Sequence, residues 1–94
     1  MPCQPCAARV VVRSPAFPAR LAAREWAPDV RVNAVLPGFV ETFDVPEDIV
    51  AQIPMDRPAQ PEEIGALVTW LSSEAASYVT GESICADGGL TRAV

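Results

Sequence analysis

The 94-residue sequence predicts an α/β fold with the order helix, strand, loop, helix, strand. The segment VRVNAVL, residues 30–36, is apolar on both faces, as the strands of a buried parallel sheet are. The helix that we expect to begin at Pro61 carries a single apolar stripe. A shorter strand is predicted over 82–86, and Asp87-Gly88-Gly89 ends it as a turn.

The composition excludes several classes of function. The chain has no histidine, and all seven of its basic residues are arginine, so an imidazole base, a Schiff-base lysine or a P-loop lysine cannot come from it. Its net charge of -5 argues against nucleic acid as a partner. We expect no membrane partner and a cytoplasmic location, because no apolar run approaches the about 18 residues of a membrane span and no secretory signal is present.

The first 19 residues differ in character from the rest. They hold four of the ten prolines and the pair Cys3 and Cys6, which with Cys85 gives an odd cysteine count. A zinc site or a thioredoxin-type site would need further ligands or a strand and helix around this C-x-x-C pair. We therefore expect residues 1–19 to be an atypical segment, either disordered or read in the wrong frame, and we expect no metal site in the chain.

Regular structure is expected from Arg20 onward. Residues 21–26 read as the last turns of a helix that Pro28 stops, and the strand 30–36 follows. Within that strand the Asn33 amide needs partners, so we expect it to tether a neighbouring backbone segment. Pro37 and Gly38 end the strand, and an acidic loop over 39–60 follows, with weak helical character over 46–53.

The clearest helix begins at Pro61, a residue favoured in the first turn, and Glu62 and Glu63 lie beside the positive end of its dipole. Gly65 weakens this helix unless a close neighbour needs the space, and Trp70 lies off the apolar stripe. The stripe follows the helical spacing i, i+3, i+4, i+7 and consists of Ile64, Leu67, Val68 and Leu71.

Residues 20–90 resemble the C-terminal third of the short-chain dehydrogenase/reductase family. The resemblance rests on N-x-x-x-P-G-x-x-x-T, beginning at Asn33, on P-E-E-I, and on Y-V-T-G-x-x-x-x-x-D-G-G, beginning at Tyr78. It implies that residues 20–94 form the C-terminal part of a Rossmann-like doubly wound parallel sheet, incomplete as a domain. It also implies an oxidoreductase that uses NAD or NADP to interconvert an alcohol and a carbonyl compound.

The resemblance assigns cofactor-binding residues. Pro37 and Gly38 follow the strand at the edge where ligands dock on open parallel sheets. The backbone at Val40 resembles the part that binds the nicotinamide carboxamide, and the Thr42 hydroxyl resembles one that reaches the carboxamide or the pyrophosphate. We expect Gly38 to give a flat ring room to approach. By the same resemblance, the loop over 39–60 is a variable substrate lid.

Other family features are not matched. The catalytic pair Y-x-x-x-K has no counterpart, because an ungapped alignment places its tyrosine at about Ala8 and its lysine at about Val12. We expect Tyr78 to serve packing and Asp87 to form a turn. The resemblance further implies a dimer or tetramer that associates through the Pro61 helix and the Glu82 strand. Two interpretations therefore stay open: an oxidoreductase that is inactive as this fragment, and a non-catalytic fragment that retains only the association surface.

Overall fold

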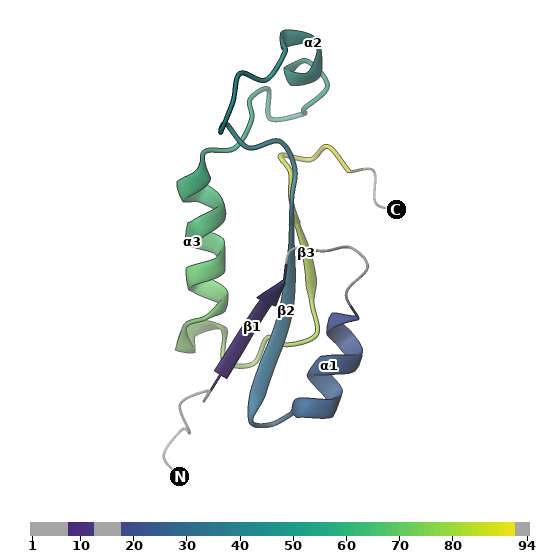
Figure 1. Ribbon diagram of the computed structural model, residues 1–94, viewed down its shortest axis with the longest axis vertical. Helices are drawn as coiled ribbons and strands as arrows, with labels where there is room; N and C mark the ends of the chain where they lie inside the picture. Colours follow the sequence, from purple (N-terminus) through teal and green to yellow (C-terminus); the bar gives the residue numbers. More distant parts are fainter. Residues whose placement is uncertain (1–7, 13–17, 92–94) are drawn as a thin grey trace.

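The computed structural model describes residues 8–12 and 18–91, which form a three-stranded parallel sheet with a helix on each face (Figure 1). The sheet order is β1-β2-β3, the same as the order along the chain. The elements are β1 (Ala8–Val12), α1 (Ala19–Trp26), β2 (Val30–Pro37), α2 (Glu47–Val50), α3 (Pro61–Leu71), the 3-10 helix η1 (Glu74–Ala76) and β3 (Ser83–Ala86). The predicted α/β class is therefore confirmed, and β1 is an addition to it.

Strand β1 lies inside the segment for which no regular structure was predicted. It pairs in parallel with the first half of β2, from Ala8 opposite Val30 to Val12 opposite Ala34. Strand β3 pairs with the second half, from Ala34 to Pro37, so β2 is the central strand. The run of β-branched residues at the end of β1 favours a strand. No strand was predicted there because the segment is rich in proline. The remaining residues of the atypical segment, 1–7 and 13–17, lie outside the described residues.

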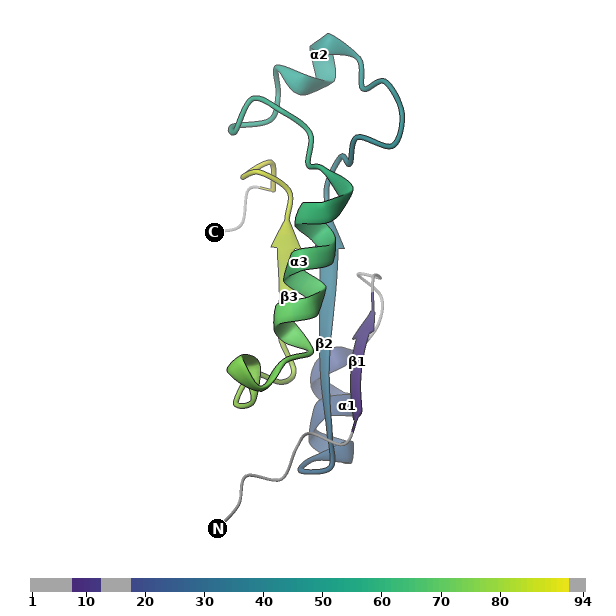
Figure 2. The ribbon, with the colours of Figure 1, turned by 90° about the vertical axis from the view of Figure 1, so that its left-hand side faces the viewer.

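Alternate residues of β2 face opposite sides of the sheet, and each side has its own helix (Figure 2). Val32 and Ala34 face α1 and form the core with Ala19 and Ala23, all of them nearly inaccessible to solvent. The small alanine side chains let α1 approach the sheet closely. On the other side lies α3, whose Leu71 is fully buried, as the apolar stripe predicts.

Two polar residues of β2 point to the α3 side and are buried there. Asn33 donates from Nδ2 to the Val79 carbonyl at 3.1 Å and accepts the Glu82 N–H at 3.1 Å, which confirms the predicted tether. The Arg31 guanidinium donates to the carbonyls of Leu71 at 2.8 Å and Val79 at 2.9 Å. A cation at carbonyls that end a helix satisfies groups that have no partner within the helix. The two side chains thus join β2, the end of α3 and the segment that leads into β3.

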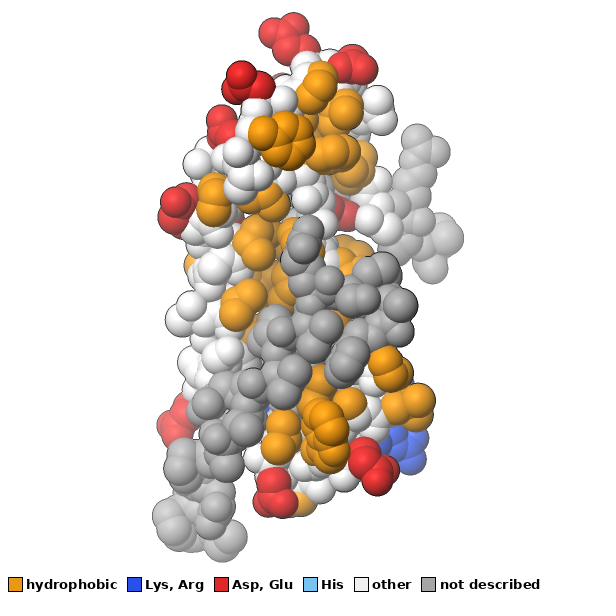
Figure 3. All heavy atoms as spheres, in the orientation of Figure 1, with side chains coloured by type: hydrophobic (Ala, Val, Ile, Leu, Met, Phe, Trp, Pro, Cys, Tyr) orange, Lys and Arg blue, Asp and Glu red, His pale blue; other side chains and the backbone are white. Residues whose placement is uncertain are grey.

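Several large apolar side chains of the described residues are exposed. Figure 3 shows apolar side chains gathered over α1 and over the loop around α2, and Leu21, Trp26, Phe43 and Met55 are exposed there. Tyr78 was expected to serve packing, but its side chain is fully exposed, because no described element covers the turn after η1. Among the residues that the structure describes, no helix is long and apolar enough to span a bilayer.

Candidate functional site

The carboxyl ends of β2 and β3 lie side by side and form one edge of the sheet. The Gly38 N–H donates to the Ala86 carbonyl at 3.1 Å, just beyond the ladder between the two strands. A Cβ atom at Gly38 would lie 2.7 Å from the Asp87 Cβ and 3.0 Å from its Cα. The prediction gave Gly38 the role of admitting a flat ring, whereas the structure shows that Asp87 fills the space beside it. Pro37 is the last residue of β2 and is half-buried.

The segment that follows Gly38 runs beside Ala59, which lies two residues before the start of α3. Val40 forms an isolated parallel bridge with Ala59, in which the Ala59 N–H donates to Phe39 at 2.9 Å and the Glu41 N–H donates to Ala59 at 2.7 Å. In such a bridge the flanking residues make the hydrogen bonds, so the N–H and carbonyl of Val40 itself point away from Ala59. The Val40 carbonyl accepts the Thr42 N–H at 2.7 Å. Within the described residues, neither the Val40 N–H nor the exposed Thr42 hydroxyl has a hydrogen-bond partner.

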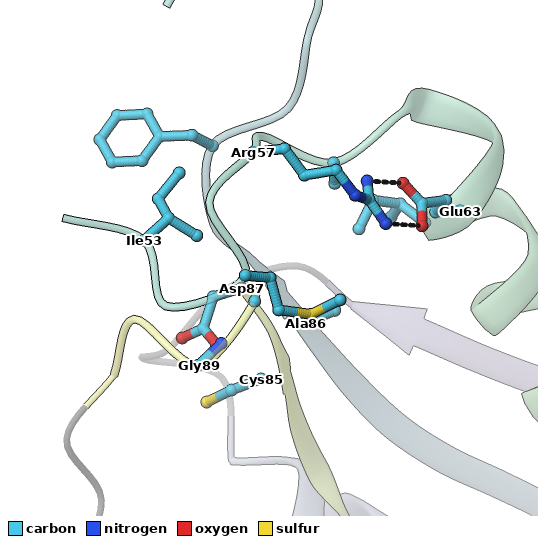
Figure 4. A pocket seen from close by; sticks show the side chains of 12 residues that line it. Ile53, Arg57, Glu63, Cys85, Ala86, Asp87 and Gly89 are labelled. Atoms are coloured by element: carbon cyan, nitrogen blue, oxygen red, sulfur yellow. Dashed lines mark hydrogen bonds and ion pairs between the residues drawn. The ribbon is translucent and has the colours of Figure 1, made fainter. Parts of the chain in front are cut away.

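An ion pair holds the return limb of the 39–60 loop to the first turn of α3 (Figure 4). The Arg57 guanidinium donates to both carboxylate oxygens of Glu63, at 2.7 and 2.9 Å. Glu63 also accepts the Gln60 N–H at 2.8 Å, which caps the start of the helix. The hydrogen bond from Arg57, followed by that from Gln60, lowers the pKa of Glu63 to about 2, and the same contact raises the pKa of Arg57. The Gln60 side-chain amide donates in turn to the Glu41 carboxylate.

This network was not predicted from the sequence. Gln60 and Glu63 have the spacing of a capping box, a signal that could have identified the contact between them. Arg57 precedes a proline and lies six residues from Glu63, a spacing that no regular element brings together. The two side chains meet only because the folded loop returns to the start of α3.

A cavity of about 390 Å³ lies between the loop, the start of α3 and the end of β3 (Figure 4). Apolar side chains line much of it, among them Phe39, Ile53, Met55 and Ile64. Of the segment 37–42, only Phe39 lines this cavity, so the four predicted cofactor-binding residues, Pro37, Gly38, Val40 and Thr42, lie outside it. The free thiol of Cys85 lies in its wall.

Asp87 forms the turn at the end of β3, as predicted. Its carboxylate accepts the N–H groups of Gly89 and Thr91, each at 3.0 Å, and the Thr91 hydroxyl. The hydrogen bond from this hydroxyl is the main cause of its lowered pKa. Gly88 and Gly89 adopt positive φ angles of 66° and 90°, which glycine tolerates best. A carboxylate that is fully engaged in its own turn is not placed to act as an acid catalyst.

In the described part of the chain, no three histidine, cysteine or acidic side chains gather as metal ligands. Cys3 and Cys6, the pair weighed as a metal or redox motif, lie outside the described residues.

Comparison with known proteins gives a consistent result. A family model described as enoyl-(acyl carrier protein) reductase matches residues 17–91. A tropinone reductase homologue of Arabidopsis thaliana is 41% identical over 83 residues, which cover 78% of this chain and 32% of the relative. A tropinone reductase homologue of Datura stramonium is 43% identical over 80 residues, which cover 71% of the chain and 30% of the relative.

The folded chain is similar to solved structures as well. The crystal structure of a short-chain dehydrogenase/reductase from Brucella melitensis, described as a glucose/ribitol dehydrogenase, superposes with a TM-score of 0.72 at 43% identity. The match covers 80% of this chain and 31% of that one. The chain thus spans about a third of the length of the proteins that it matches.

Proposed function

Because this chain belongs to the short-chain dehydrogenase/reductase family, we propose that it supplies the C-terminal, nicotinamide-binding part of an NAD(P)-dependent oxidoreductase. The reaction class is the interconversion of an alcohol and a carbonyl compound. Ligands of open parallel sheets bind outside the carboxyl ends of the strands, which is where the segment 37–42 lies.

The observation that carries this proposal is the pair of open hydrogen-bonding groups after β2. The Val40 N–H points away from the bridge to Ala59, and the Thr42 hydroxyl two residues later is exposed. A backbone donor beside a hydroxyl fits a carboxamide or a phosphate, each of which presents acceptor oxygens. Pro37 and Gly38 contribute by fixing the path of the chain into this segment, with Gly38 packed against Asp87.

In the proposed site the cofactor would be held by the Val40 backbone and the Thr42 hydroxyl. A nicotinamide bound there would supply the hydride-transfer chemistry. This chain's own residues would orient the ring. The positions aligned with the catalytic tyrosine and lysine hold Ala8 and Val12, and neither alanine nor valine has a side-chain group that can transfer a proton. We therefore propose that this polypeptide alone does not turn over substrate.

A fluorescence titration tests cofactor binding. The fluorescence emission of NADH should change when NADH binds to the purified full chain. Thr42→Val should raise the Kd for NADH by about threefold to tenfold, the equivalent of one hydrogen bond. Thr69→Val is the matched control, because Thr69 is exposed on α3, away from the carboxyl edge. An unchanged emission at millimolar NADH in the wild-type chain would contradict nicotinamide binding.

The alternative function is association without catalysis, through α3 and β3, in a homodimer or homotetramer. It is favoured by the half-exposed Trp70 on α3 and by the full exposure of Tyr78 beyond the end of that helix. Large apolar side chains that stay in water within one chain are typical of surfaces that a partner covers. A chain that sediments as a dimer but leaves NADH emission unchanged would support this alternative. A cytoplasmic location stays a prediction.

A further inference from the structure

The segment 39–42, which contains Val40 and Thr42 and is called the cofactor segment below, makes few backbone hydrogen bonds within the described residues. Its backbone is held by the two hydrogen bonds to Ala59, and beyond the bridge the chain continues into the exposed 39–60 loop. An isolated bridge of this kind opens more easily than a strand within a sheet, because only two hydrogen bonds hold it. The conformation of Val40 and Thr42 therefore depends on what fixes Ala59.

Ala59 is fixed by contacts on its C-terminal and N-terminal sides. On the C-terminal side, the N–H of Gln60 is held by Glu63 and its side chain reaches Glu41. On the N-terminal side, Arg57 donates to Glu63 through both of its terminal nitrogens. The Glu63 carboxylate thus contacts residues on both sides of Ala59, and Glu63 itself is held in the first turn of α3.

We infer that Glu63, together with Arg57 and Gln60, forms a clamp that positions the cofactor segment 39–42 by fixing Ala59. The inference rests on the proposed function for the role of this segment, but the clamp itself is a property of the free chain. Glu63 is a positioning residue, because it acts through Ala59 and contacts none of the predicted cofactor-binding residues.

The neighbouring glutamate provides a matched control. Glu62 lies in the same first turn of α3, so Glu62→Gln removes the same charge from the same end of the helix dipole. Among the described residues, the Glu62 carboxylate makes no hydrogen bond or ion pair. Any difference between Glu62→Gln and Glu63→Gln therefore reports the clamp.

The experiment measures residue-resolved hydrogen exchange and NADH affinity on the full chain. In Glu63→Gln the amides of Glu41 and Ala59 should exchange about threefold to fivefold faster. This factor corresponds to the small free energy that an exposed bidentate ion pair contributes to stability. The Ala34 amide, which donates to Glu82 in the sheet, should keep its rate. The Kd for NADH should rise by a similar factor, and Glu62→Gln should change neither quantity.

A second variant separates the effect of losing the ion pair from the effect of losing the helix cap. Arg57→Met breaks the ion pair from the loop side and leaves the contact between Glu63 and Gln60 intact. The inference is overturned if both variants exchange at the Glu62→Gln rate, or if exchange accelerates while the affinity for NADH stays unchanged. If the wild-type chain does not bind NADH, the proposed function fails, and the exchange rates alone decide whether the clamp exists.

Discussion

Replacing Gly38 by alanine should destabilise the free chain, because the new methyl group would collide with Asp87. Its Cβ would lie 2.7 Å from the Asp87 Cβ, whereas carbon atoms attract each other at about 3.5–4.0 Å. Asp87 cannot move away easily, since two backbone N–H groups hold its carboxylate. Separating the strand ends would instead stretch the 3.1 Å hydrogen bond from Gly38 to Ala86.

The expected loss for Gly38→Ala is about 1–3 kcal/mol of unfolding free energy, the usual cost of an added methyl group in a packed site. Gly65→Ala is the opposite control, because nothing lies within 4 Å of its added Cβ in the helix α3. That variant should gain about 0.5–1 kcal/mol from helix propensity. The two glycine substitutions are therefore predicted to differ in sign.

Urea unfolding followed by circular dichroism measures both changes without any cofactor. A Gly38→Ala chain as stable as the wild type would refute the packing argument and restore the view that Gly38 serves only the approach of a ligand. Asp87→Gly combined with Gly38→Ala gives a further check, since removing the opposing Cβ should recover part of the loss in a double-mutant cycle.

Three further predictions concern buried and charged residues. Asn33→Ala should cost about 1–3 kcal/mol in urea unfolding, because it leaves the Glu82 N–H without its partner, and a loss below about 0.5 kcal/mol would contradict the tether. Leu71→Ala should cost about 2–5 kcal/mol at a fully buried site, measured in the same way, and a near-neutral result would mean that α3 is not anchored there. The pKa of Glu63 is lowered from 4.5 to about 2 in the folded chain. Its ion pair therefore stabilises the chain fully at pH values above 4.5, and this stabilisation is lost as the pH falls to about 2. The stability difference between wild type and Glu63→Gln should shrink over that range in urea titrations, and a difference independent of pH would contradict the ion pair.

The elements that could be predicted from the sequence are those with local signals. Helix α3 begins at Pro61 and ends at Leu71 because a first-turn proline, two glutamates and an apolar stripe all lie within one short window. Strand β2 was predicted from its run of apolar residues, and its polar Asn33 was correctly expected to bind backbone. In each case the residues that decide the structure are neighbours along the chain.

The features that were missed depend on distant contacts. Strand β1 is short and flanked by prolines, so its three valines were too weak a local signal, and its pairing with β2 identifies it as a strand. Arg31 is a charged residue in an otherwise apolar strand, and its partners are carbonyls 40 and 48 residues further along, at the end of α3 and beyond. The candidate site divides in the same way. The motif located the segment 37–42, but the contact of Gly38 with Asp87 and the ion pair of Arg57 with Glu63 require the folded chain.

The placement of the two helices on opposite faces of the sheet also separates the two tryptophans of the chain (Figure 2). Trp26 ends α1 and Trp70 lies near the end of α3, and the two are almost equally exposed, at 47% and 46%. Their intrinsic emission should therefore start from similar solvent environments. A partner that covers α3 would shift the emission of Trp70 to shorter wavelength and protect it from a soluble quencher, while Trp26 would serve as an internal reference. The chain thus carries its own optical reporter for the face on which it is contacted.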